Sequence, residues 1–313
     1  DFAQQLKLKV EEIEEDLKLL DNFGDEIRRR DDELAALGWE LLTEGRALSA
    51  ARKKTAESLS SKVEKELKDL GMPKARKGQV PLVLYVHGGG WKRGSKDSAT
   101  GWAKPVHYPA QGYAFASINY RLVPEATVEQ QAADVADALA ALLARADALG
   151  IDRTKVVLMG HSAGAHLVAL VGTDERYLRG AGLSFADVEG VIPNDGAAYD
   201  VPAQMQDSGR FMQDTYKQAF GTDPARQRAL SPSWQAAAPN APRFLLLHVQ
   251  RADGVKQAEG LAAALRKAGT GVEIASFPGD GLKGHAEINR RLGEQDYPAT
   301  GVVDGWMKAV FGP

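Results

Sequence analysis

Residues 156–171 read VVLMGHSAGAHLVALV and decide the expected fold of this chain. The first four residues predict a buried strand and the last seven predict an apolar helix, so a sharp turn with Ser162 at its apex must join them. Gly160 and Gly164 remove the Cβ atoms at the two points where strand and helix crowd each other. The amide of Ala163 then lies at a helix N-terminus, where free N–H groups favour an anion. The pattern therefore predicts a serine hydroxyl presented above a sheet.

A second motif occurs about seventy residues earlier, where residues 82–91 read LVLYVHGGGW. An apolar strand ends there in His-Gly-Gly-Gly, which is typical of a loop whose backbone amides hold an oxyanion. The two motifs follow each other in the order and strand context that acyl-transfer chemistry requires. Together they indicate a serine nucleophile far more specifically than either motif alone.

Composition excludes several classes of function. The formal net charge is −3, so there is no general electrostatic case for nucleic acid or for an anionic membrane surface. The sequence contains no cysteine, which excludes disulfides, thiolate metal sites and a cysteine nucleophile. No apolar run approaches the roughly 20 residues of a membrane helix. A charged helical pattern stands where a signal peptide would begin, so we expect a cytoplasmic protein.

Charge is unevenly distributed along the chain. Residues 1–78 contain 16 Lys/Arg and 18 Asp/Glu, so their charge density is about twice that of the remainder. A 4-3-4-3 spacing of apolar residues predicts a coiled-coil seam, formed by Leu6, Val10, Ile13, Leu17 and Leu20. We expect residues 1–76 to form a helical, coiled-coil-like segment with helices at 1–21 and 25–70. Its seam must be buried, either against the same segment of a second chain or against a sheet edge of this chain, and self-association is the favoured arrangement.

This segment resembles the returning coiled-coil arm of RecN-type DNA-repair ATPases over about 75 residues, most specifically at 47–54 and 63–76. Those ATPases need a Walker A loop, and the sequence contains no G-x-x-x-x-G-K-[ST]. The resemblance therefore implies a coil fragment, and hence a fusion, without ATP hydrolysis.

From Lys77 onward, apolar strands alternate with helices, which predicts an α/β domain with a parallel sheet covered on both faces. Strands are expected at 81–86, 112–120, 156–159, 188–193, 244–249 and 272–277, and helices at 128–149, 255–268 and 302–311. Residues 193–243 are irregular and are expected to form loops and short helices over the pocket.

A serine nucleophile needs a base to take its proton. His285 is our candidate because it lies in GDGLKGHAE, residues 279–287, which we expect to be a glycine-rich loop after the last strand. The other histidines are expected to be structural, with His87 bracing the oxyanion loop: His87, His107, His161, His166 and His248.

The base in turn needs an orienting carboxylate. Asp253 follows the strand at 244–249 and fits the chain order Ser…Asp…His, so it is the first candidate. Asp280 is the alternative, although its closeness to His285 in sequence would require a tight loop.

Residues 79–313 resemble α/β-hydrolase carboxylesterases of the hormone-sensitive-lipase-like group, in particular bacterial feruloyl-esterase-like members. The matching pieces are HGGGW at 87–91, NYRLVPE at 119–125, GHSAG at 160–164, Asp253, and Gly284-His285. The resemblance covers about three quarters of the chain. It implies an α/β-hydrolase fold that acts on small carboxylic esters.

The resemblance also implies roles for individual residues. Ser162, His285 and Asp253 would form the catalytic triad. An oxyanion hole would come from the amides of Gly89, Gly90 and Ala163, with Gly88 a possible substitute. Apart from the resemblance, Trp91 and Trp102 stand close to the oxyanion loop in sequence, so they are expected to offer an aromatic wall to the substrate. No metal or cofactor is implied.

The family has two antiparallel strands before the strand that carries the oxyanion loop, and here the predicted helix runs almost to Pro81. Residues 112–120 would then become a sheet edge. Two other hypotheses remain open. Arylformamidases share a similar His-Gly-Gly-x-Trp loop and the same triad, and the chain could instead be a coiled-coil interaction module fused to a disabled hydrolase domain.

Overall fold

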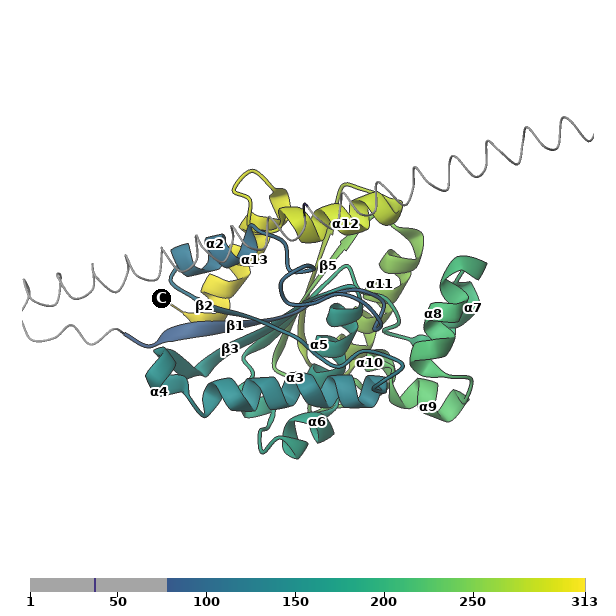
Figure 1. Cartoon of the computed structure of the whole chain (residues 1–313), viewed down its shortest axis with the longest axis horizontal. Helices are drawn as coiled ribbons and strands as arrows, with labels where there is room; N and C mark the ends of the chain where they lie inside the picture. The colour runs from purple at the N-terminus through teal and green to yellow at the C-terminus, as the bar shows by residue number, and fades with distance from the viewer. Residues whose placement is uncertain (1–36, 38–77, 313) are drawn as a thin grey trace, which may run out of the picture. The chain divides into compact units, whose positions relative to one another are not determined.

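The computed structural model describes residue 37 and residues 78–312, and the latter fall in one compact unit, Lys77–Pro313 (Figure 1). Leu37 is helical. The other predictions for residues 1–76, namely two helices, a coiled-coil seam, a RecN-like arm and a self-association surface, lie outside the described residues.

Six strands form one parallel sheet in the order β2-β1-β3-β4-β5-β6. All six predicted strands are confirmed: β1 (Val80–Val86), β2 (Ala114–Ile118), β3 (Ile151–His161), β4 (Gly190–Asn194), β5 (Arg243–Val249) and β6 (Gly271–Phe277). The strand β3 extends well beyond the predicted 156–159, and the other bounds move by at most two residues. Within the part of the chain that is described, β2 is an edge strand, as predicted from the helical pattern that runs almost to Pro81 in place of the family's first two strands.

Helices cover both faces of the sheet (Figure 1). Strand side chains alternate between the faces, so Leu84 and Leu158 join one apolar cluster while Tyr85 and Met159 join the other. The first cluster packs against α3 (Val128–Leu143), α5 (Ala163–Thr173), α6 (Glu175–Gly180) and α11 (Ala252–Lys267). The second packs against α2 (Lys104–Ala110), α12 (Gly281–Arg291) and α13 (Pro298–Phe311). Two-sided burial explains why the central strands are continuous apolar runs.

The remaining elements are short: α4 (Ala146–Leu149), η1 (Phe185–Asp187), α7 (Val201–Asp207), α8 (Arg210–Phe220), α9 (Pro224–Ala229) and α10 (Pro232–Gln235). The predicted helix at 128–149 is broken into α3 and α4. Residues 193–243 contain short helices, as expected.

The predicted loop at 279–287 is wrong, because α12 begins at Gly281 and carries His285. The apolar side chain of Ile288 is fully buried in the second apolar cluster, and this burial stabilises the glycine-rich segment as a helix.

All six strands run in the same direction, so their carboxyl ends meet at one edge of the sheet, where ligands bind in open α/β folds. The residues that follow β1, β3, β4, β5 and β6 are therefore brought to this edge although they are far apart in sequence. None of the helices within residues 78–312 has the length and apolar character needed to cross a membrane.

The apolar cluster around Leu158 should dominate stability. Leu158 is fully buried in the middle of the sheet, so Leu158→Ala should lower the free energy of unfolding by about 3 kcal/mol through lost burial and a cavity. Leu149→Ala, at a side chain that is 43% exposed, is the matched control and should change it by less than about 1 kcal/mol. Urea unfolding followed by circular dichroism measures both, and equal effects would contradict this account.

Candidate active site

Ser162 occupies the turn between β3 and α5 with positive backbone dihedral φ of 55°, a strained conformation for a residue with a side chain. Its amide donates to the carbonyl of Asn194 at the end of β4, at 3.1 Å. A Cβ on Gly160 would lie 2.2 Å from the carbonyl oxygen of Gly164, and a Cβ on Gly164 would lie 2.1 Å from that of Val86. The close approach that the motif predicts is therefore present, and only glycine allows it.

The loop after β1 lies directly against this turn, because a Cβ on Gly88 would be 3.0 Å from the Cβ of Ser162. Gly89 and Gly90 both have positive φ, of 132° and 62°, so their peptide groups turn away from strand geometry. Within residues 78–312, the amides of Gly88, Gly89 and Gly90 have no backbone acceptor. Their N–H groups therefore remain available next to the serine, where an oxyanion would form.

His87 holds this loop in place, as the sequence predicts. Its Nδ1 donates to the carbonyl of Gly88 at 2.8 Å, and its ring stacks on Tyr120 at a centroid distance of 4.4 Å. The Tyr120 hydroxyl donates in turn to the carbonyl of His87 at 3.0 Å. Burial lowers the pKa of His87, which keeps the imidazole neutral.

His285 on α12 pairs with Asp195, the first residue after β4. Its Nδ1 lies 2.5 Å from Asp195 Oδ2, and the Asp195 side chain is fully buried. Asp195 has φ of 44°, and its Oδ1 accepts from the amide of Val249 at 3.2 Å. Burial would raise the pKa of Asp195, but the hydrogen bond from His285 and the charge of Arg251 outweigh it and hold that pKa below its usual range. The carboxylate is therefore ionised and aimed at the imidazole.

His161 holds the backbone of His285 in place. Its Nε2 donates to the backbone carbonyl of His285 at 2.9 Å, and the two rings lie 4.5 Å apart. Burial, followed by the nearby His285, lowers the pKa of His161 well below its usual value, so it is a neutral donor. Because His161 immediately precedes Ser162, this contact places His285 beside the serine turn.

The expectation that Asp253 orients His285 is not met. Asp253 lies in the first turn of α11, where its Oδ2 accepts from Arg251 Nη1 at 2.6 Å and from Gln204 Nε2 at 3.2 Å. Asp280, the alternative, is an exposed residue before α12. The turn at Asp195 brings a carboxylate closer to α12 than the β5–α11 connection does. A signal was present in the sequence, since an aspartate stands directly after a buried strand.

A family model described as BD-FAE matches residues 68–260. The chain belongs to the BD-FAE family. It is 30% identical over 197 residues to esterase LipC from Mycobacterium tuberculosis (strain ATCC 25618 / H37Rv), an alignment that covers 60% of this chain and 48% of LipC. It is also 31% identical over 108 residues to kynurenine formamidase from Danio rerio, covering 34% of this chain and 35% of that protein. The chain thus spans about half or less of the length of these curated relatives.

Solved structures share the fold of this BD-FAE member. The acetyl ester-xyloside bifunctional hydrolase from Caldicellulosiruptor lactoaceticus superposes with a TM-score of 0.59 at 21% identity, over 75% of this chain and 84% of that one. At this identity the likeness shows the α/β-hydrolase core alone. The match to the family model begins at residue 68, so it does not test the predictions made for residues 1–67.

Trp91 does not line an open site in this BD-FAE member, contrary to its predicted substrate contact. Its side chain is 1% exposed and packs against Tyr216 and Phe220 of α8. The indole Nε1 donates to His166 Nδ1 at 3.3 Å, and His166 Nε2 donates to the carbonyl of Leu230 at 2.8 Å. Trp91 therefore anchors the glycine loop after β1 to α8. Trp102, in contrast, is exposed.

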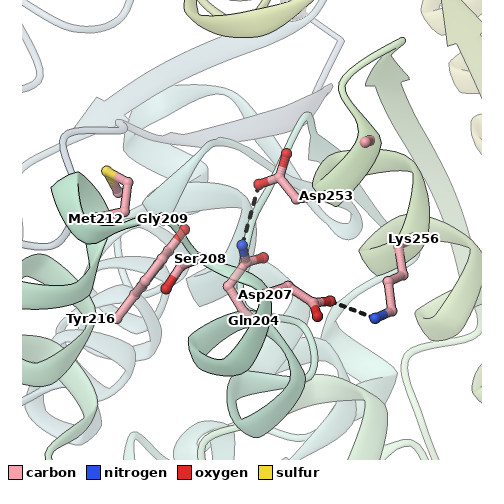
Figure 2. A pocket seen from close by; sticks show the side chains of 9 residues that line it. Gln204, Asp207, Ser208, Gly209, Met212, Tyr216, Asp253 and Lys256 are labelled. Atoms are coloured by element: carbon pink, nitrogen blue, oxygen red, sulfur yellow. Dashed lines mark hydrogen bonds and ion pairs between the residues drawn. The ribbon is translucent and has the colours of Figure 1, made fainter.

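A pocket of about 430 Å³ opens between α7, α8 and the start of α11 (Figure 2). Its lining is mixed in polarity: Gln204, Asp207, Ser208, Gly209, Met212, Tyr216, Ala252, Asp253 and Lys256. Two contacts join it to the site, because Tyr216 packs on Trp91 and Asp253 pairs with Arg251, which in turn lies 3.5 Å from Asp195. The pocket is therefore one residue removed from both groups, through Tyr216 on Trp91 and through Asp253 on Arg251.

Lowering the pH should destabilise the folded protein through His166, which joins Trp91 to the carbonyl of Leu230. Burial lowers the pKa of His166 from 6.5 to about 4, so the unfolded chain takes up a proton below pH 6.5 that the folded protein resists. Stability should therefore fall between about pH 6.5 and pH 4, with up to about 3 kcal/mol from this group. His166→Gln keeps a donor and an acceptor without titrating.

Urea unfolding at several pH values compares the two proteins. The variant should lose less stability than the native protein across this window. Parallel curves for the two proteins would contradict the assignment to His166.

Proposed function

We propose that this chain is a serine carboxylesterase in which Ser162 is the nucleophile, His285 the base and Asp195 the orienting acid. The observation that carries the proposal is the buried Asp195 carboxylate on His285 Nδ1, beside a strained serine turn and free loop amides. Membership of the BD-FAE family, with an esterase among its relatives, supports the same chemistry.

In the proposed mechanism, His285 Nε2 removes the Ser162 proton while Oγ bonds to the ester carbonyl carbon. The carbonyl electron pair moves to oxygen, and the amides of Gly89, Gly90 and Ala163 stabilise the oxyanion, with Gly88 adjacent. One such donor contributes about 3–4 kcal/mol to the transition state. Collapse breaks the bond to the alcohol oxygen, which takes the proton from His285. Water then repeats the sequence on the acyl-enzyme and restores Ser162.

Asp195 has two effects in this scheme. It accepts the hydrogen bond from Nδ1, which fixes the tautomer that leaves Nε2 free to take a proton. Its negative charge also stabilises the imidazolium that forms during attack.

The pocket supports small or flat substrates of the feruloyl-esterase-like class. It offers one aromatic ring, Tyr216, one thioether, Met212, and several polar groups, so it suits a compact group with hydrogen-bonding substituents. We therefore expect short or aromatic acyl esters to be hydrolysed faster than long-chain ones. A series of p-nitrophenyl esters measures this preference, and a maximum at long chains would contradict it.

Amide hydrolysis is the second candidate, because kynurenine formamidase from Danio rerio is among the similar proteins. The same triad and oxyanion hole would serve N-formyl substrates. Comparing kcat/KM for p-nitrophenyl acetate with that for N-formylkynurenine separates the two functions, and a preference for the formamide would replace the esterase proposal.

Three substitutions test the proposed triad. Ser162→Ala and Asp195→Asn should each lower kcat by about 10³-fold or more while leaving the fold intact, because nucleophile and acid act as one unit. Asp253→Asn, a matched carboxylate-to-amide change at the pocket, should retain most activity near neutral pH.

Circular dichroism and labelling by a fluorophosphonate probe accompany the kinetics. A folded Ser162→Ala protein with normal turnover would exclude Ser162. Full activity in Asp195→Asn with loss in Asp253→Asn would restore Asp253 as the acid. A native protein that neither reacts with the probe nor turns over esters would favour the disabled hydrolase.

For residues 1–76, the proposal is self-association through the seam at 6–20. Light scattering of the full chain and of a chain lacking 1–76 tests it together with esterase activity. Loss of the oligomer with activity retained supports the proposal, and an unchanged monomer before and after deletion excludes it.

A further inference from the structure

Next to the proposed triad lies an ion pair, Arg251 with Asp253, for which the mechanism above has no use. It stands between the acid Asp195 and the pocket of Figure 2, where the Asp253 carboxylate is seen at the edge of the lining. The inference below rests on the proposed function, since it takes Asp195 and His285 as the acid and base.

Arg251 is held on three sides. Nη1 donates to Asp253 Oδ2 at 2.6 Å and Nη2 donates to the carbonyl of Gly196 at 3.1 Å. Its Nε is buried 3.5 Å from Asp195 Oδ2 and has no hydrogen-bond partner among the described residues. The side chain is only 15% exposed, so its charge acts on Asp195 with little screening by water.

The carboxylate of Asp253 is placed differently. It is 33% exposed, lines the pocket and also accepts from Gln204 Nε2. It touches the guanidinium but not the Asp195–His285 pair. Its electrostatic effect on that pair therefore acts through Arg251, whose positive charge it partly neutralises.

Other charged or titratable groups surround His285. His161 contacts it from β3 as a neutral donor. The buried Lys104 of α2, whose pKa burial lowers to about 7, donates to Thr100 and to Asn289 of α12. On α12 itself, Glu287 pairs with Arg291 at 3.5 Å. These groups stay the same when only Arg251 or Asp253 is changed.

We propose that Arg251 is a positioning residue that holds the Asp195 carboxylate and offsets part of its charge, and that Asp253 keeps this arginine in place and screens it. The protonated, cationic form of His285 is stabilised by Asp195 and opposed by Arg251. Changing either charge of the pair Arg251–Asp253 should therefore alter the balance between the neutral and the cationic imidazole.

Opposite effects follow for the two partners. Arg251→Met removes a positive charge and leaves the negative charge of Asp253 unpaired, so the cationic form of His285 is favoured. The midpoint of the acidic limb in the pH profile of kcat/KM should therefore move to higher pH, by about one unit. Asp253→Asn removes the screening charge, so the same limb should move down, by a smaller amount because Asp253 is more exposed. The double variant should return towards the native midpoint.

The experiment measures kcat/KM for p-nitrophenyl acetate against pH at constant ionic strength. Arg251→Lys keeps the charge but loses the two-pronged contact, so its midpoint should stay near the native one even if its rate falls. Misfolding cannot produce shifts of opposite sign, which keeps the test informative if Arg251→Met is less stable.

A matched control is present in the same chain. Asp174, the N-cap residue of α6, and Arg176 in its first turn are also two residues apart and ion-paired, at 2.6 Å, and neither lines the pocket of Figure 2. Asp174→Asn and Arg176→Met should leave the midpoint unchanged. Shifts at Arg251 and Asp253 that have the same sign, or that do not exceed those of this control pair, would overturn the inference.

Failure of the inference differs from failure of the proposed function. If Asp195→Asn is inactive and the limb does not move in Arg251→Met, the triad stands and only the role of the ion pair is wrong. If Asp195→Asn is fully active, the triad itself is wrong and the inference falls with it.

Discussion

Close approach of three backbone segments is the constraint on which this site depends. The carbonyl of Val86 at the end of β1 and the carbonyl of Gly164 in α5 lie where Cβ atoms on Gly164 and Gly160 would stand. No residue larger than glycine allows the strand, the turn and the helix to meet at these distances. The strained Ser162 and the adjacent Gly88 are consequences of that contact, so the serine turn and the glycine loop after β1 are positioned together.

Electrostatics around Asp195 depends on a different set of contacts. A buried carboxylate would ordinarily be driven towards its neutral form, and the surrounding donors reverse this. The pKa is lowered by His285 of α12, by Arg251 before α11 and by His161 at the end of β3. The amide of Val249 at the end of β5 donates to the other carboxylate oxygen. The charge state of Asp195, the proposed acid, therefore depends on several elements that meet at this sheet edge.

The irregular region 193–243 links the pocket to the chemistry. Its helix α8 supplies Tyr216 and Phe220 against Trp91 on one side, and Tyr216 and Met212 to the pocket on the other. A buried tryptophan thus fixes the distance between the oxyanion loop and the pocket wall. Variation in α7 and α8 can change the pocket without altering the glycine contacts beneath it, which is how loops confer specificity on a rigid scaffold.

By itself, the sequence determined the α/β class, all six strands and the two motifs around Ser162 and Gly88–Gly90, because apolar runs and glycine spacings are local patterns. It also singled out His285, although in a loop rather than in α12. Only the tertiary structure decided which carboxylate meets that histidine. Asp195 and Asp253 both follow strands at the same sheet edge, and the choice between them depends on the backbone turn at Asp195 and on Arg251 and Gln204 holding Asp253 away. Trp91 likewise became a buried anchor through contacts with α8, more than 100 residues away, which no local pattern records.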